Sequence, residues 1–300
     1  MSTILTYNTA EFRLTILRFF ILSFLVSISS YGQDKTLDQY EQELNEISPI
    51  LLNGKNELER FSANEKFVEI WDLILDNPKS LKHKFESIKN FPIITSKDKK
   101  LRIINWIVAL DNNTYQYHGI VQYFNSSNKY QVSRLIPLSG EMKNVESIKL
   151  ENNNWYGALY YQMEEIKRGN KKYYVLLGWN GNDERSNIKV IDVLSVKKDL
   201  VFGAPIFRVD KKRLNRYIIE YKEDASASIK FKKKEDRIVF SNLIPLNDGM
   251  EGLYDYYVPD GSINAFELSN GSFKFKRDVE NTEKVNIPKI RKIRTGLMPN

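Results

Sequence analysis

The sequence predicts an α+β protein in which a short N-terminal helical segment precedes a large antiparallel β domain. Three observations predict this class. Apolar residues follow a helical period before residue 95, they follow a period of two from residue 101, and turn signals rather than helices separate the later runs. The β domain is expected to be a sandwich or barrel-like, with a propeller as the minor alternative because no repeat of fixed period is found.

The first 32 residues have the parts of an export signal. Two arginines precede an apolar run over residues 19–28, and Ser30-Tyr31-Gly32 places the cleavage site before Gln33. We therefore expect a cleaved signal peptide over residues 1–32, with an uncleaved N-terminal anchor as the alternative. Because the apolar run is too short to cross a bilayer comfortably, no transmembrane span is expected in the mature chain.

Residues 33–94 are expected to form the helical segment. A first apolar stripe is interrupted at Ser48-Pro49, and a second helix is expected to begin at the capping box Ser62–Glu65. Asn77 and Pro78 predict the cap and first position of a third helix. His83 falls off the apolar stripe of that helix, so we expect an exposed histidine. The apolar positions of the three stripes are Leu37, Tyr40, Leu44, Ile47, Phe67, Ile70, Trp71, Ile74, Leu81, Phe85 and Ile88.

Residues 95–280 are expected to form the antiparallel β domain around one hairpin. Gly169-Asn170 lies between two aromatic, apolar runs, which predicts a two-residue hairpin loop. That loop would pair Ile166 with Tyr173 and Tyr161 with Gly178, so that an aromatic ring covers a strand glycine. Large apolar residues occupy both faces of both strands, which predicts that both faces of the hairpin are covered.

Composition excludes several kinds of site. The chain has no cysteine, which excludes disulfides and thiolate metal sites, and its two histidines disfavour a histidine-rich zinc site within one chain. Its net charge is +7, and much of the excess lies in a basic C-terminal tail over residues 281–300. We interpret this charge as a solvated tail, with contact to anionic lipid or polysaccharide as the alternative. No nucleic-acid partner is expected for an exported protein.

Four stretches resemble uncharacterised exported proteins of the Bacteroidota. They are KLRIINW at 100–106, WYGALYY at 155–161, YYVLLGWNGND at 173–183 and PDGS at 259–262. The resemblance covers roughly residues 95–280 and implies a lineage and an exported location, but no chemistry. No C-terminal sorting domain is apparent, which favours the periplasm over the cell surface.

The loop that follows the second strand of the hairpin is the first candidate site. Trp179, Asn180, Asn182 and Asp183 are the candidate ligand-binding residues, since Asp, Asn and backbone carbonyls in a tight loop are typical calcium ligands. Asp260, in an expected Asp-Gly turn, is the second candidate metal ligand beside Asp183. An ordinary turn is the alternative for each, because neither loop matches a calcium motif.

No catalytic residue and no cofactor are predicted. His118 would need an orienting carboxylate and a nucleophile beside it, and the sequence places neither, so we interpret it as a structural or surface histidine. The leading hypothesis is a non-enzymatic binding or scaffolding module of the cell envelope, with an envelope glycan or a protein as partner. The alternative is a carboxylate-dependent hydrolase acting on glycans, for which many acidic residues are available but no pair is selected.

Overall fold

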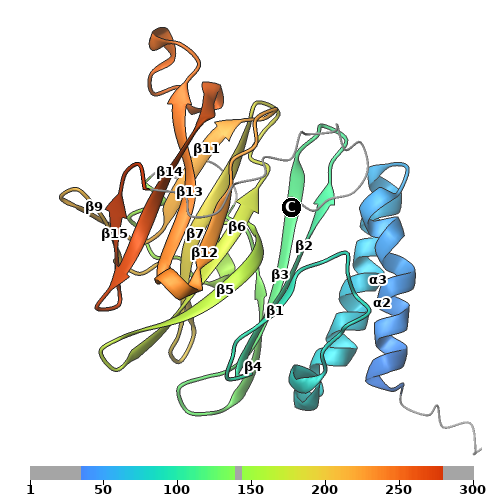
Figure 1. The fold of residues 1–300 in the computed structure, drawn as a ribbon. Coiled ribbons are helices and arrows are strands. Elements are labelled where there is room, and N and C mark those ends of the chain that lie inside the picture. The colour runs from blue at the N-terminus through green and yellow to red at the C-terminus, as the bar shows by residue number, and fades with distance from the viewer. Residues whose placement is uncertain (1–34, 139–143, 280–300) are drawn as a thin grey trace, which may run out of the picture.

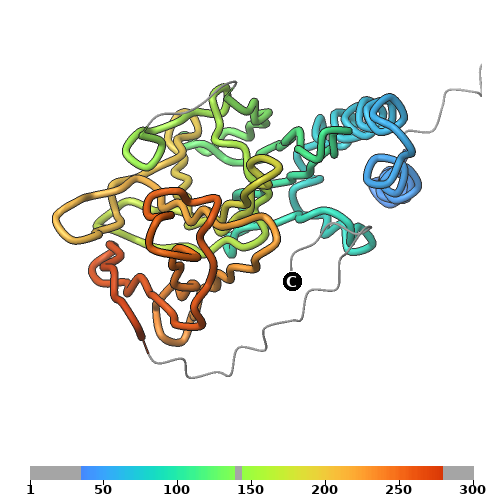
Figure 2. The backbone as a smooth tube through the Cα atoms, turned by 90° about the horizontal axis from the view of Figure 1, so that it is seen from above, coloured from blue at the N-terminus to red at the C-terminus, as the bar shows by residue number. Residues whose placement is uncertain are grey.

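The structure is a computed structural model that describes residues 35–138 and 144–279. The expected signal peptide and basic tail lie outside the described residues. A layer of helices is followed by three sheets that pack face to face, the sandwich form among the expected alternatives (Figure 1). Seen from above, the helices stand at one end of the molecule and the C-terminal strands towards the other (Figure 2). The α+β class and the order of its two parts are confirmed.

The first helix, α2 (Leu37–Asn53), runs through Pro49, where the sequence predicted an interruption. That prediction was wrong: Pro49 removes the one hydrogen bond that its own N–H would have donated, and the helix continues past it. The fully buried side chains of Leu44 and Leu51 hold the helix on both sides of the proline. None of the helices that the structure describes is both long and apolar enough to cross a bilayer.

The second helix, α3 (Glu57–Leu75), begins at Asn56 and not at Ser62. The Asn56 side chain accepts a hydrogen bond from the Glu59 backbone N–H at 2.9 Å, which caps the helix. The predicted capping box at Ser62 therefore lies inside the helix. Ala63, in the same turn, is buried against the core, and this burial stabilises the helix at the predicted start position.

The third helical element, η1 (Pro78–Lys82), is one 3₁₀ turn rather than the expected helix through Ile88. Its start is as predicted, with Asn77 as the cap and Pro78 at the first position. The buried guanidinium of Arg102 holds its C-terminal end. Arg102 donates to the backbone carbonyls of Ser80 and Leu81, both at 2.8 Å, and to that of His83. The Ser80 carbonyl also accepts the His83 N–H at 3.0 Å, and beyond it the backbone of His83 is extended, so Arg102 anchors the end of the turn.

The strands of the three sheets are antiparallel neighbours, except for one parallel pair, β15 with β9. The first sheet has the order β1-β2-β3-β4: β1 (Ile93–Thr95), β2 (Leu101–Ala109), β3 (Tyr115–Phe124) and β4 (Tyr130–Leu135). The second has the order β11-β7-β6-β5, with β8 also on β7: β5 (Leu159–Arg168), β6 (Lys171–Asn180), β7 (Ser186–Val196), β8 (Leu200–Phe202) and β11 (Tyr217–Lys222). The third has the order β10-β9-β15-β14-β13-β12: β9 (Phe207–Val209), β10 (Lys212–Leu214), β12 (Ile229–Lys232), β13 (Arg237–Pro245), β14 (Tyr257–Ser269) and β15 (Ser272–Lys276).

Three apolar cores join the layers. Phe67 and Trp106 lie in the core between the helices and the first sheet. Leu176 lies in the core between the first and second sheets, and its neighbour Leu177 lies in the core between the second and third. Because adjacent residues of β6 point into different cores, the predicted covering of both faces of this hairpin is confirmed.

The β5–β6 hairpin has the predicted loop, and Ile166 pairs with Tyr173 as expected. The predicted pairing of Tyr161 with Gly178 is wrong: Tyr160 lies opposite Gly178, because a bulge at Tyr161 shifts the register by one residue. The aromatic ring of Tyr160 covers the glycine instead, with a ring carbon 2.8 Å from where a Cβ would stand. The buried side chain of Asn105 on β2 accepts from the backbone N–H of Tyr160 and donates to its carbonyl, which links the first two sheets.

Candidate functional site

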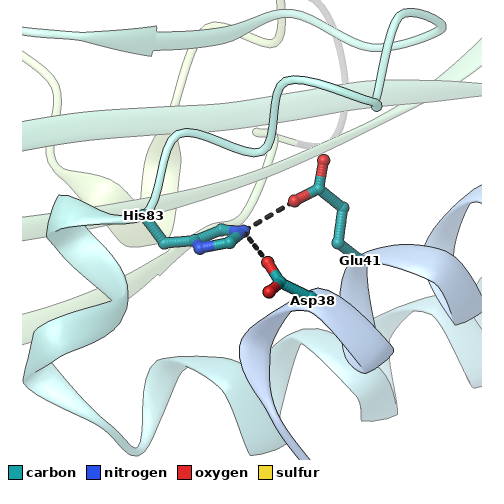
Figure 3. Close-up of side chains that lie close together, drawn as sticks. All are labelled: Asp38, Glu41 and His83. Atoms are coloured by element: carbon teal, nitrogen blue, oxygen red, sulfur yellow. Dashed lines mark hydrogen bonds and ion pairs between the residues drawn. The ribbon is translucent and has the colours of Figure 1, made fainter.

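Asp38, Glu41 and His83 form the candidate site (Figure 3). Within residues 35–138 and 144–279, theirs is the one group of three or more acidic or histidine side chains whose ligand atoms all lie within 4.8 Å of one another. The Nε2 atom of His83 lies 2.6 Å from Oε2 of Glu41 and 3.7 Å from Oδ1 of Asp38.

Local structure positions each of these three side chains. Asp38 and Glu41 are three residues apart on α2, so they project from the same face of the helix. His83 lies directly after η1, where the bond from Arg102 to its carbonyl holds its backbone. The ring of His83 also packs edge-on against Phe85, with centroids 4.5 Å apart. Phe85 is buried and has a φ of 52°, so the chain turns sharply just after the histidine.

Glu41 is the buried member of the group. Its Oε1 accepts hydrogen bonds from the backbone N–H and the hydroxyl of Ser87, at 2.6 and 2.5 Å, while its Oε2 faces His83. Burial acts to raise the pKa of Glu41, but the hydrogen bonds from Ser87 and His83 outweigh it, so the pKa lies below its ordinary value. Glu41 is therefore ionised at neutral pH and available as an anionic ligand.

The arrangement is not that of a serine nucleophile and its base. A histidine base must accept the proton of the serine hydroxyl. Here the Ser87 hydroxyl donates to the carboxylate of Glu41, and the same hydroxyl accepts from the Asn45 amide at 2.5 Å. The carboxylate thus stands between the hydroxyl and the imidazole, which leaves His83 facing two carboxylates.

The three side chains open into a cleft of about 880 Å³ between α2 and the segment 82–87. Acidic side chains outnumber basic ones along its wall, which gives the cleft a negative lining. The charged lining residues are Asp38, Glu41, Glu46, Glu86, Lys82 and Lys84.

The ligand set fits a divalent transition metal ion. Zinc binds imidazole nitrogen and carboxylate oxygen at about 2.0–2.2 Å, which places tetrahedral ligand atoms about 3.3–3.5 Å apart. The 3.7 Å between Asp38 and His83 is close to that spacing, whereas the 2.6 Å between Glu41 and His83 must open by about 0.7 Å. Ser87 would remain on the other oxygen of Glu41, the kind of outer hydrogen bond that orients a metal ligand.

The predicted ligand-binding residues lie together where β6 leads into β7, and their polar atoms form hydrogen bonds within and next to this loop. Asn180 donates to the Gly157 carbonyl and accepts from the Asn182 backbone N–H at 2.6 Å. Asp183 accepts from the backbone N–H of Arg185 at 2.8 Å, an Asx turn, and from that of Ser186 at 2.9 Å. The side chain of Asn182 donates to the Ser186 hydroxyl at 2.7 Å. The indole N–H of Trp179 donates to Asn187 at 3.1 Å, and its ring packs edge-on against Tyr115.

Asp260, the second predicted metal ligand, lies within β14 of the third sheet. The expected Asp-Gly turn between two strands is wrong there, because one strand continues through it as an irregular stretch in which Gly261 has a φ of 90°. The carboxylate of Asp260 accepts from the backbone N–H and hydroxyl of Ser262 and from Asn242. Asp260 and Asp183 come from different sheets, and neither belongs to the group around His83.

His118 lies on β3 and stacks on Trp106, with centroids 5.3 Å apart and planes 7° from parallel. Its Nε2 lies 3.3 Å from Gln116 Oε1, and no acidic residue pairs with it among the described ion pairs. Burial, with a further contribution from Arg134, lowers the pKa of His118 to about 4. The fold therefore disfavours the imidazolium, as expected for a structural histidine.

Stability is expected to fall as the pH drops from about 6.5 towards 4, because His118 then takes up a proton more readily in the unfolded chain than in the fold. The melting temperature should be measured between pH 7 and pH 5, above the range in which Glu41 titrates. A His118→Gln variant should show a flatter profile over this range. An unchanged slope in the variant would show that the half-buried imidazole of His118 does not cause the loss.

Sequence reasoning missed the group around His83. Two signals were present: the three-residue spacing of Asp38 and Glu41 and the position of His83 outside the apolar stripe. Neither shows that His83 and Glu41, 42 residues apart, meet, because that depends on how Arg102 holds the backbone at the end of the 3₁₀ turn. The expectation of an exposed helical histidine is wrong, since His83 is outside any helix and pairs with Glu41.

Comparisons with known proteins do not add an activity to this geometry. No protein-family model matches the chain, and no curated protein and no solved structure matches it significantly.

Proposed function

We propose that the protein is an exported binding or scaffolding module of the cell envelope that holds a divalent transition metal ion in the cleft between α2 and segment 82–87. The observation that supports this proposal is the convergence of His83 Nε2 with carboxylate oxygens of Asp38 and Glu41. The export signal and the resemblance to exported Bacteroidota proteins support the location, and the periplasm is the compartment we propose.

Three protein ligands leave a further coordination position open to the cleft. A structural zinc site is closed by four protein ligands, whereas an open position accepts a donor from outside. An envelope glycan or a protein partner would supply that donor as a hydroxyl or carboxylate oxygen. The metal would then join the module to its partner.

The chemistry of Glu41 favours binding over glycan hydrolysis in this cleft. A glycosidase needs one carboxyl group that keeps its proton near neutral pH, which requires a raised pKa. The pKa of Glu41 is lowered instead by the hydrogen bonds from Ser87 and His83. An ionised Glu41 is suited to coordinate a cation and unsuited to protonate a leaving group.

Zinc is expected to raise the melting temperature of residues 33–300. At about 100 times its dissociation constant, a ligand stabilises by about 2.7 kcal/mol, a shift of roughly 2–4 °C for a chain of this size. Asp38→Asn should reduce the shift, and because the Asp38 side chain is 89% exposed, this variant should fold normally. Glu46→Gln, which alters an acid of the same cleft outside the group, should keep the shift.

Calcium in parallel samples separates this site from the loop at Asp183. Calcium prefers six to eight oxygen ligands, so it should shift the melting temperature less than zinc does. A calcium shift that is abolished by Asp183→Ala would place the metal in the β6–β7 loop instead. Equal zinc shifts in the wild-type and Asp38→Asn proteins would overturn the proposed site.

A further inference from the structure

The third sheet carries an exposed apolar arm between β13 and β14. We define the arm as residues 243–259, which include two short 3₁₀ turns, η4 (Asp248–Met250) and η5 (Tyr254–Tyr256). It extends beyond the rest of the sheet (orange in Figure 1). Four of its large apolar side chains are 44–54% exposed: Ile244, Leu246, Leu253 and Tyr254. A cluster of exposed apolar side chains on a projecting arm is typical of an interaction surface.

The arm is also acidic. Residues 243–259 contain Asp248, Glu251 and Asp255 and no lysine or arginine. Asp255 pairs with Arg185 at 3.3 Å, while Asp248 and Glu251 lie exposed beside the apolar side chains. The complementary partner is therefore a segment that combines apolar residues with positive charge.

The chain itself contains a segment of that chemistry. Residues 284–294 carry five basic residues and no acidic residue, and three isoleucines recur among them at every third position. These residues are Lys284, Lys289, Arg291, Lys292, Arg294, Ile287, Ile290 and Ile293.

The last described residues lead towards the arm. β15 runs antiparallel to β14, and Val279 still donates its backbone N–H to the Ile263 carbonyl at 2.8 Å. Beyond that point β14 continues back to Tyr257, and in the described chain no strand pairs with this part of its outer edge. The stretch from Ile263 to Tyr257 spans six residues, or about 20 Å at 3.3 Å per residue. A segment of six residues such as 280–285 is long enough to span that distance, so the isoleucines would be able to reach the tip of the arm.

We propose that residues 284–294 of the same chain dock on the arm, with the isoleucines against Leu246, Leu253 and Tyr254 and the basic side chains beside Asp248 and Glu251. The exit of the chain at Val279, the open edge of β14 and the match of charge and apolarity all favour this occupant. The contact would cover the exposed apolar side chains of the arm.

Cysteine crosslinking tests the proposal, because the chain has no cysteine of its own. Met250→Cys on the arm is combined with Asn286→Cys in the tail, and the purified protein is treated with a short bismaleimide. The control pair combines Asn286→Cys with Leu58→Cys, at an 80% exposed position on α3 in the helix layer. Within single chains, the arm pair should crosslink several-fold more than the control pair, and the yield should fall at high salt.

Charge reversal gives a second readout. Asp248→Lys with Glu251→Lys should lower the crosslinking yield several-fold, and adding Lys289→Glu with Lys292→Glu should restore it. Equal yields for the arm and control pairs would overturn the proposal. Crosslinked dimers from the arm pair would also overturn it and would assign the arm to the tail of a second copy.

Discussion

Replacing Arg216 with methionine is expected to lower the free energy of unfolding by about 3–5 kcal/mol, because it leaves the buried carboxylate of Asp192 without its counter-charge. Both side chains are fully buried, and Nε of Arg216 lies 3.2 Å from Oδ1 of Asp192. The hydroxyl of Tyr160 donates to the other oxygen of Asp192 at 2.9 Å. The Arg216→Met variant therefore loses the attraction between the two charges but still bears the desolvation free energy of the buried Asp192 carboxylate.

The same guanidinium also holds a loop against the second sheet. Nη1 of Arg216 donates to the backbone carbonyls of Val145 and Ile148, at 2.5 and 3.1 Å. Methionine fills much of the arginine's volume but donates no hydrogen bond, so the segment 144–150 should also lose protection from proteolysis. Urea unfolding of the variant, followed by limited proteolysis under native conditions, measures both effects.

Two further variants separate charge from packing. Arg213→Met changes an exposed arginine of β10 and should alter the unfolding free energy by no more than about 0.5 kcal/mol. Adding Asp192→Asn to Arg216→Met should recover part of the loss, since a neutral amide costs less to bury and its oxygen still accepts from Tyr160. If the double variant were no more stable than Arg216→Met alone, packing rather than charge would account for the effect.

Replacing Trp106 with alanine is expected to cost about 3–5 kcal/mol and to loosen the helix layer. Trp106 is 1% exposed, packs edge-on against Phe67 of α3 at 5.1 Å, and donates its indole N–H to Asn64 at 2.7 Å. The truncation removes these contacts and leaves the buried amide oxygen of Asn64 without its donor.

Denaturant unfolding with a protease assay measures the Trp106→Ala effect. Cleavage within α2 and α3 should become faster than cleavage within the second and third sheets, because the lost contacts join the helices to the first sheet. Leu58→Ala, at an 80% exposed position of α3, is the matched control and should stay within about 0.5 kcal/mol of wild type. A uniform rise in cleavage across all layers would contradict a local role for Trp106.

Patterns that repeat over a few residues were sufficient to predict the class of the fold. The helical period before residue 95, the period of two after it and the Gly169-Asn170 loop all correspond to elements of the structure. Asn77 and Pro78 start a helical turn as predicted. These features depend on local backbone preferences and on the alternation of buried and exposed positions, which a sequence displays directly.

Contacts between distant residues decided where the elements end and which side chains meet. The Arg102 guanidinium holds the end of the 3₁₀ turn and the backbone of His83, while the bulge at Tyr161 places Tyr160 rather than Tyr161 opposite Gly178. The pairing of His83 with Glu41 depends on that arrangement, and the sequence contains no local signal for it. The hydrophobic period of a helix or strand indicates which of its faces is buried. Which residues pack against that face depends on contacts between segments that are distant in the sequence.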